Sequence, residues 1–201
     1  MNKTARGKFI VIEGCDNSGK STLAEYLGKV IPNCVNYKEP NFSSEQSDAL
    51  NFLCENAFDR EAIFLEDHLL AQEKYEEALA SGQNVILDRY LWTGLAYLSA
   101  FTPDVLPAYE AIYLKTKNLF LVPDAYMFIK TPSEALYARR DNDKINMGVI
   151  NSIVDGYFKY EDKVPCGKKI IVENDRSLEE LLVDGYASLL VEFKDTFSIG
   201  G

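Results

Sequence analysis

The sequence has few cysteines, one histidine and no long hydrophobic run among its 201 residues. Its four cysteines lie far apart and form no Cys-x-x-Cys pair, which excludes a local zinc motif or a dense disulfide framework. No segment approaches the roughly 18 consecutive apolar residues of a membrane span, and the basic N-terminus lacks a signal-peptide core. We therefore predict a protein of the reducing cytoplasm that has no membrane partner.

Positive charge is also scarce. The chain has 21 Lys and Arg against 31 Asp and Glu, giving a net charge of −10. Proteins that hold long nucleic acids by the backbone usually present a basic face. We therefore expect no nucleic acid partner, and a small-molecule ligand whose phosphates are met by locally concentrated positive charge.

A glycine-rich loop at residues 14–22 is the clearest motif that is present. It reads Gly-Cys-Asp-Asn-Ser-Gly-Lys-Ser-Thr, matches G-x-x-x-x-G-K-[ST], and lies between an apolar segment and a helical pattern. The loop amides and the positive end of the helix dipole suit phosphate oxygens, and the first hydroxyl after the lysine suits Mg²⁺. We predict a nucleoside triphosphate site formed by Gly14, Asn17, Ser18, Gly19, Lys20, Ser21 and Thr22, with Ser21 also a metal ligand.

Apolar runs alternate with helical patterns along the chain, and no repeat or linker divides it. We predict one domain over residues 1–201, with strands at 8–13, 34–38, 84–88, 125–130 and 169–172. We predict helices at 20–30, 45–56, 61–81, 90–100, 106–118, 132–140, 148–163 and 177–193. This order indicates an α/β protein with a three-layer P-loop NTPase fold, in which a five-stranded parallel sheet has helices on both faces.

An Asp88-Arg89 pair directly follows the apolar run at 85–87. Ligands of parallel sheets gather at the carboxyl ends of the strands, where the phosphate loop also lies. Asp88 can hold Mg²⁺ directly or through water, and the planar guanidinium of Arg89 can bridge phosphates. A salt-bridged strand end would also account for the pair, but the position at this edge favours a catalytic role.

Arg139, Arg140 and Lys144 crowd the end of a helix that begins near Pro132. A solvated helix terminus, with cations placed well against the dipole, would explain them structurally. We favour a lid at about 139–148 that closes its cations over a transferring phosphoryl group and excludes water.

These three elements, in this order, resemble the thymidylate kinase family of nucleoside monophosphate kinases from residue 8 to about 190. The resemblance implies phosphoryl transfer from ATP, with Mg²⁺, to the 5′-phosphate of a deoxynucleoside monophosphate. It points first to dTMP, giving dTDP for deoxynucleotide synthesis, and to a homodimer. Lys20, Arg89 and the three lid cations would then be the catalytic residues.

The resemblance also assigns the acceptor site. Asp16 matches a loop acid that contacts the acceptor's sugar and phosphate region, and Pro40 matches a residue that shapes the acceptor pocket. Phe64 occupies the position of an aromatic that stacks on the base. Tyr97 ends a segment similar to the family's D-R-[YH]-x-x-S-x-x-A-[YF], whose aromatic lies against the sugar and disfavours a 2′-hydroxyl. Arg89 would contact the acceptor as well.

Two departures from the family pattern affect two assignments: the identity of the acceptor nucleotide, and the residues that stabilise the γ-phosphate. His68 stands where the family carries an arginine that reads the base edge, so another or a modified pyrimidine deoxynucleotide is a further candidate. Asn17 stands where some members have an arginine, which shifts γ-phosphate stabilisation to the lid cations. Two alternatives to this function would also need a triphosphate site. One is a deoxynucleoside kinase that uses Glu13 as general base, and the other is a nucleotide-dependent switch or binding module.

Overall fold

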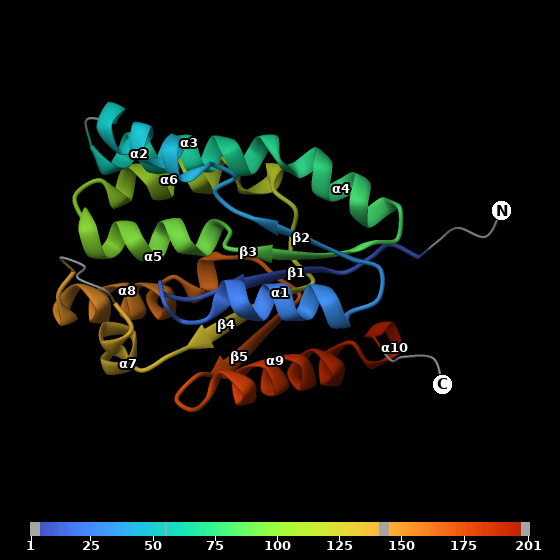
Figure 1. The fold of residues 1–201 in the computed structure, drawn as a ribbon. Coiled ribbons are helices and arrows are strands. Elements are labelled where there is room, and N and C mark those ends of the chain that lie inside the picture. The colour runs from blue at the N-terminus through green and yellow to red at the C-terminus, as the bar shows by residue number, and fades with distance from the viewer. Residues whose placement is uncertain (1–4, 55, 141–144, 198–201) are drawn as a thin grey trace.

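The computed structural model describes residues 5–54, 56–140 and 145–197, and in this part of the chain five parallel strands form one sheet (Figure 1). The strands are β1 Phe9–Glu13, β2 Cys34–Lys38, β3 Asn84–Asp88, β4 Ala125–Lys130 and β5 Lys168–Glu173, and their order across the sheet is β2-β3-β1-β4-β5. Each strand joins the next through at least one helix, as parallel pairing requires. The predicted fold class is confirmed.

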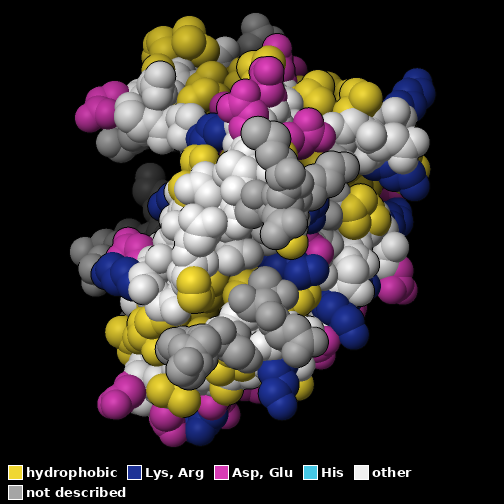
Figure 2. Space-filling view, turned by 90° about the vertical axis from the view of Figure 1, so that its right-hand side faces the viewer, with side chains coloured by type: hydrophobic (Ala, Val, Ile, Leu, Met, Phe, Trp, Pro, Cys, Tyr) yellow, Lys and Arg dark blue, Asp and Glu magenta, His cyan; other side chains and the backbone are white. Residues whose placement is uncertain are grey.

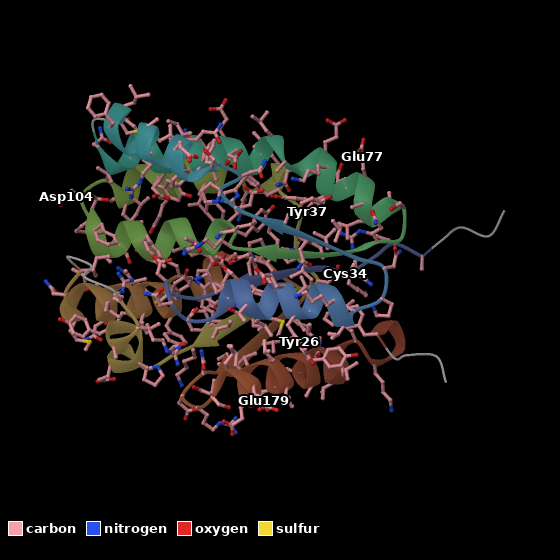
Figure 3. The ribbon with its side chains drawn as sticks, viewed as in Figure 1. Tyr26, Cys34, Tyr37, Glu77, Asp104 and Glu179 are labelled. Carbon is pink, nitrogen blue, oxygen red and sulfur yellow. The ribbon has the colours of Figure 1, made fainter. Side chains whose placement is uncertain are left out.

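Helices cover both faces of the sheet. Their bounds are α1 Lys20–Val30, α2 Ser44–Leu53, α3 Ala57–Leu70, α4 Gln72–Ala80, α5 Leu91–Phe101, α6 Leu106–Thr116, α7 Ser133–Ala138, α8 Met147–Lys159, α9 Leu178–Glu192 and α10 Lys194–Phe197. Helices α1 and α9 pack on one face, and Tyr26 contributes a ring contact to Tyr186 between them (Figure 3). Helices α3, α4, α5, α6 and α8 contribute to the core on the other face.

Strand β1 lies at the centre of the sheet and explains why both faces are stable. Phe9 and Val11 point into the core under α4 and α5, whereas Ile10 and Ile12 point into the core under α1. Since successive side chains alternate between faces, an unbroken apolar strand is buried on both sides. Each such side chain contributes about 1.5–3 kcal/mol when fully buried.

The long helix predicted at residues 61–81 is wrong, because the structure contains two helices that meet at Ala71. The Gln72 side chain turns inward, where its amide donates to the His68 carbonyl and its oxygen accepts from the Tyr90 hydroxyl and the Leu121 amide. Tyr90 and Leu121 lie far from Gln72 in the sequence, so the helical pattern alone cannot reveal the break. The first of the two helices also begins earlier than predicted, at Ala57.

Two predicted helix ends are confirmed by their local chemistry. Gly82 has φ 87°, the left-handed conformation that suits glycine after a helix, and Ser177 forms a capping box with Glu180 at the start of α9.

Among the described residues, no helix combines the length and the apolar character of a membrane span. On the face shown in Figure 2, basic and acidic side chains are interspersed, without a continuous basic surface.

Candidate active site

The phosphate loop joins β1 to α1 at the carboxyl edge of the sheet, on the left in Figure 1. Gly14, Asn17 and Gly19 all have positive φ angles, of 147°, 64° and 93°, so the backbone curls around the space in front of the helix. Lys20 opens α1 with its side chain only 5% exposed, and its ammonium donates to the Cys15 carbonyl at 2.7 Å. Burial, and then the charge of Arg89, lower the pKa of Lys20 to about 8.

A polar cavity of about 290 Å³ opens over this loop. The residues lining it are Asp16, Asn17, Gly19, Lys20, Ser21, Thr22, Lys38 and Arg89. Sequence reasoning missed Lys38. It reaches the cavity because the register of β2 against β3 pairs it with Asp88.

The structure brings the two predicted metal ligands together. The Ser21 hydroxyl donates to Asp88 Oδ2 at 2.5 Å, and Asp88 Oδ1 is buried without a hydrogen-bond partner in the described part of the chain. A hydroxyl and a carboxylate are oxygen ligands of the kind that Mg²⁺ prefers. The described residues form no cluster of three or more His, Cys, Asp and Glu, so phosphates and water would have to supply the other ligands. The metal role of the pair stays a prediction.

Arg89, Asp16 and Tyr97 form a connected group. The Arg89 guanidinium pairs with Asp16 Oδ1, the Tyr97 hydroxyl donates to Asp16 Oδ2 at 2.8 Å, and Arg89 lies over the Tyr97 ring at 5.7 Å. Burial pushes the pKa of Asp16 up, but the charges of Arg89 and Lys20 outweigh it and the pKa is lowered. Asp16 is therefore an anion held among cations.

A second and larger cavity, of about 660 Å³, lies between α3, α5 and the strand ends. All six residues predicted to bind the acceptor line it: Asp16, Pro40, Phe64, His68, Arg89 and Tyr97. The lining residues that sequence reasoning missed are Glu39, Arg60, Glu61, Tyr90, Thr93, Gly94, Phe101, Thr102 and Tyr109. Asp16 and Arg89 belong to both cavities, so the two sites meet at these side chains.

His68 is only 7% exposed, at one wall of the larger cavity. Its Nδ1 lies 3.7 Å from Glu39 Oε2, and the Tyr75 hydroxyl donates to the other oxygen of Glu39. Burial lowers the pKa of His68 to about 4, and burial together with the neighbouring Asp67 raises the pKa of Glu39 to about 8. The imidazole is therefore neutral at pH 7, unlike the arginine expected at this position.

Glu13 does not reach either cavity. It is fully buried beneath them, where it accepts from the Tyr90 amide at 2.9 Å and the Thr93 hydroxyl at 2.6 Å. Burial raises the pKa of Glu13 to about 7. Through these hydrogen bonds Glu13 links β1 to the start of α5. The same bonds count against the general-base role that a deoxynucleoside kinase would need.

The buried carboxyl groups make stability depend on pH. The folded-state pKa values of Glu13 (about 7), Glu39 (about 8) and Glu61 (about 7) all exceed the unfolded value of 4.5, so ionisation opposes folding as the pH rises. The protonation of His68 affects stability only below its unfolded-state pKa of 6.5. The deprotonation of Lys20 affects stability only above its folded-state pKa of about 8. Between pH 6.5 and 8 we expect the free energy of unfolding to fall by about 1–3 kcal/mol in urea titrations. A flat or rising profile in this window would contradict it.

Only part of the predicted lid at 139–148 falls within the described residues, and its role stays a prediction. After α7, the Arg139 guanidinium donates to the Asn17 carbonyl at 3.3 Å, so this segment contacts the phosphate loop. Arg140 follows and is close enough for its charge to act on Cys15, although burial raises the pKa of that thiol to about 12. Lys144 and the rest of 141–144 lie outside the described residues.

The fold and the phosphate loop beside two adjoining cavities are those of a P-loop phosphotransferase. The sequence profile of a family described as Thymidylate kinase matches residues 12–149. The chain therefore belongs to the thymidylate kinase family and is a nucleoside monophosphate kinase.

Individual relatives agree with this assignment. The chain is 35% identical over 150 residues to the thymidylate kinase of Leptospira borgpetersenii, covering 67% of this chain and 70% of that protein. It is 26% identical over 194 residues to the thymidylate kinase of Aliarcobacter butzleri, covering 92% and 97%. The solved structure of thymidylate kinase from Candida albicans has the same fold, with a TM-score of 0.75 at 18% identity over 98% of this chain and 96% of that one.

Proposed function

We propose that this enzyme transfers the γ-phosphoryl group of ATP to the 5′-phosphate of dTMP. The observation that carries the proposal is the meeting of the two cavities at Asp16 and Arg89. A phosphate loop on one side and an apolar cavity with an aromatic wall on the other suit a triphosphate that faces a nucleotide acceptor. The relatives named above act on thymidylate, which makes dTMP the first acceptor to test.

On the donor side, the phosphate-loop amides and Lys20 would hold the β- and γ-phosphates. Mg²⁺, held by Ser21 and by Asp88 directly or through water, would supply charge neutralisation at the phosphates. Arg139, Arg140 and Lys144 would add positive charge at the transferring group and exclude water. An acceptor phosphate oxygen attacks the γ-phosphorus, the bond to the β-phosphate oxygen breaks, and ADP and dTDP leave.

On the acceptor side, the work of the protein is positioning, since the acceptor phosphate is already nucleophilic and needs no strong base. Arg89 would bridge the two phosphate groups, and Asp16 would hold the sugar and phosphate region. Phe64 would stack on the base beside Pro40, while the neutral His68 would contact the base edge with at most one ring N–H. Tyr97, already bonded to Asp16, would lie against the sugar.

A coupled ADP-release assay tests this function. With ATP and Mg²⁺ fixed, we expect dTMP to raise the rate of ADP formation by at least about tenfold over the rate without acceptor. The panel includes dUMP, dCMP, dAMP, dGMP, thymidine and an oligonucleotide. Stimulation by thymidine instead of dTMP would indicate a nucleoside kinase, and basal hydrolysis that no acceptor changes would indicate a switch or binding module.

Three further expectations accompany this function. We expect the chain to act as one kinase domain, to form the homodimer typical of its family, and to work in the cytoplasm. Phe52, Leu53 and Leu70 are strongly exposed apolar side chains on α2 and α3, and helices in this part of the fold are the ones that we expect at the dimer contact. Sedimentation of the purified protein would measure the mass in solution.

A further inference from the structure

Glu61 is a buried acid on the cavity wall that the proposed mechanism does not use. It is 6% exposed and lies on α3 three residues before Phe64 and seven before His68. Positions separated by three and seven residues share one helix face, and all three side chains line the larger cavity. A carboxyl group in a mostly apolar pocket is costly unless something there bonds to it.

The two oxygen atoms of Glu61 have different surroundings. Arg60 Nη2 lies 3.3 Å from Oε1, so this oxygen is already paired. A Cβ atom built on Gly94 would lie 3.5 Å from Oε2 and 2.5 Å from the Tyr109 hydroxyl. Both polar groups therefore lie beside Gly94 at the cavity wall, and any larger residue at 94 would collide with the Tyr109 hydroxyl.

Tyr109 supplies the second group from a different helix, α6. Its ring is buried against the cavity, where burial and then the charge of Glu61 raise the pKa of its hydroxyl well above the ordinary value. The phenol therefore keeps its proton and can donate or accept a hydrogen bond. Burial likewise raises the pKa of Glu61 to about 7.

We propose that Glu61 Oε2 and the Tyr109 hydroxyl, above Gly94, form a subsite that binds a hydroxyl group of the acceptor nucleotide. The subsite rests on the proposed function only in that the occupant of the cavity is a nucleotide. A hydroxyl donates one hydrogen bond and accepts another, which matches a carboxyl oxygen beside a phenol. An acceptor that presents a methyl or a hydrogen to these two groups instead would leave both without that partner, and sites of this kind reject such analogues strongly.

The hydroxyl has two possible sources in a bound nucleotide. Glu61 lies one helical turn from Phe64, so a hydroxymethyl substituent on the ring stacked there is one source. A sugar hydroxyl is the other. In the first case the kinase favours pyrimidine deoxynucleotides modified at C5, and in the second the subsite reads the deoxyribose of dTMP itself.

Steady-state kinetics on matched pairs of acceptors separate these sources. We compare 5-hydroxymethyl-dUMP with dTMP for the base and dTMP with 3′-deoxythymidine monophosphate for the sugar. For one pair we expect the wild type to favour the hydroxyl-bearing member by at least about tenfold in kcat/KM. Tyr109→Phe and Glu61→Gln should each reduce that preference by at least about fivefold. Glu66→Gln, which removes an exposed charge from the same helix, should leave it unchanged.

The outcomes are decisive in both directions. A preference within about twofold of wild type in both Tyr109→Phe and Glu61→Gln overturns the subsite and indicates that Glu61 serves only as the partner of Arg60. Tyr109→Phe keeps the ring and its packing, so it carries the test if Glu61→Gln does not fold. If no monophosphate is phosphorylated, the proposed function fails, and the same ratios are then measured as dissociation constants by calorimetry.

Discussion

Replacing Lys20 with alanine should lower kcat by about 10²–10³-fold while the fold is retained. The ammonium is the cation that α1 places directly at the phosphate loop, where it donates to the loop's own Cys15 carbonyl. Stabilising charge at a transferring phosphoryl group is the largest contribution that this type of site makes, and removing one preorganised donor of this kind costs about 10²–10³ in rate. The measurement is kcat for ADP release with both nucleotides saturating.

The stability of the same variant separates catalysis from folding. Because burial lowers the pKa of Lys20 to about 8, the folded protein already disfavours this charge, and its loss should not lower the unfolding midpoint. Lys29→Ala, at the exposed end of the same helix, is the matched control and should leave kcat unchanged. A Lys20→Ala enzyme that keeps more than about a tenth of wild-type turnover would remove Lys20 from the mechanism.

The sheet could be read from the sequence because its strands are governed by local pattern. Strands at 34–38, 84–88 and 125–130 have the predicted bounds, and the apolar run before the phosphate loop has no other stable placement than a strand buried on both faces. The break at Ala71 could not be read, because it depends on Gln72 bonding to Tyr90 and Leu121 across the core. Helix ends set by tertiary hydrogen bonds have no signature in a single segment.

In the candidate site, too, residues in contiguous motifs could be predicted from the sequence, whereas a residue positioned by tertiary packing could not. Asp16, Arg89 and Tyr97 lie in or beside contiguous motifs, and the structure gathers them at one point as expected. Glu61 could have been found, since it shares the helix face of Phe64. Tyr109 could not, because it reaches the cavity only through the packing of α6 over Gly94.

Replacing Arg89 should have an effect as large as the loss of Lys20. This side chain is the one cation among the described residues that lines both cavities, a position from which it would contact donor and acceptor phosphates together. A guanidinium that bridges two phosphates forms paired hydrogen bonds that a lysine cannot reproduce. We expect Arg89→Lys and Arg89→Gly each to lower kcat/KM for dTMP by about 10³-fold or more.

The backbone of Arg89 distinguishes this loss from unfolding. Its φ of 73° lies in the left-handed region, which costs a non-glycine residue about 1–2 kcal/mol. Arg89→Gly removes that strain and should keep an unfolding midpoint near wild type, whereas Arg89→Ala keeps the strain without the ion pair to Asp16 and should melt lower than Arg89→Gly. An inactive, stable glycine variant would place the effect in phosphate binding, and an active one would show that the two phosphates meet elsewhere. Glycine at position 89 would relieve the backbone strain, yet the chain carries an arginine there. The function of the guanidinium therefore accounts for the side chain at this position.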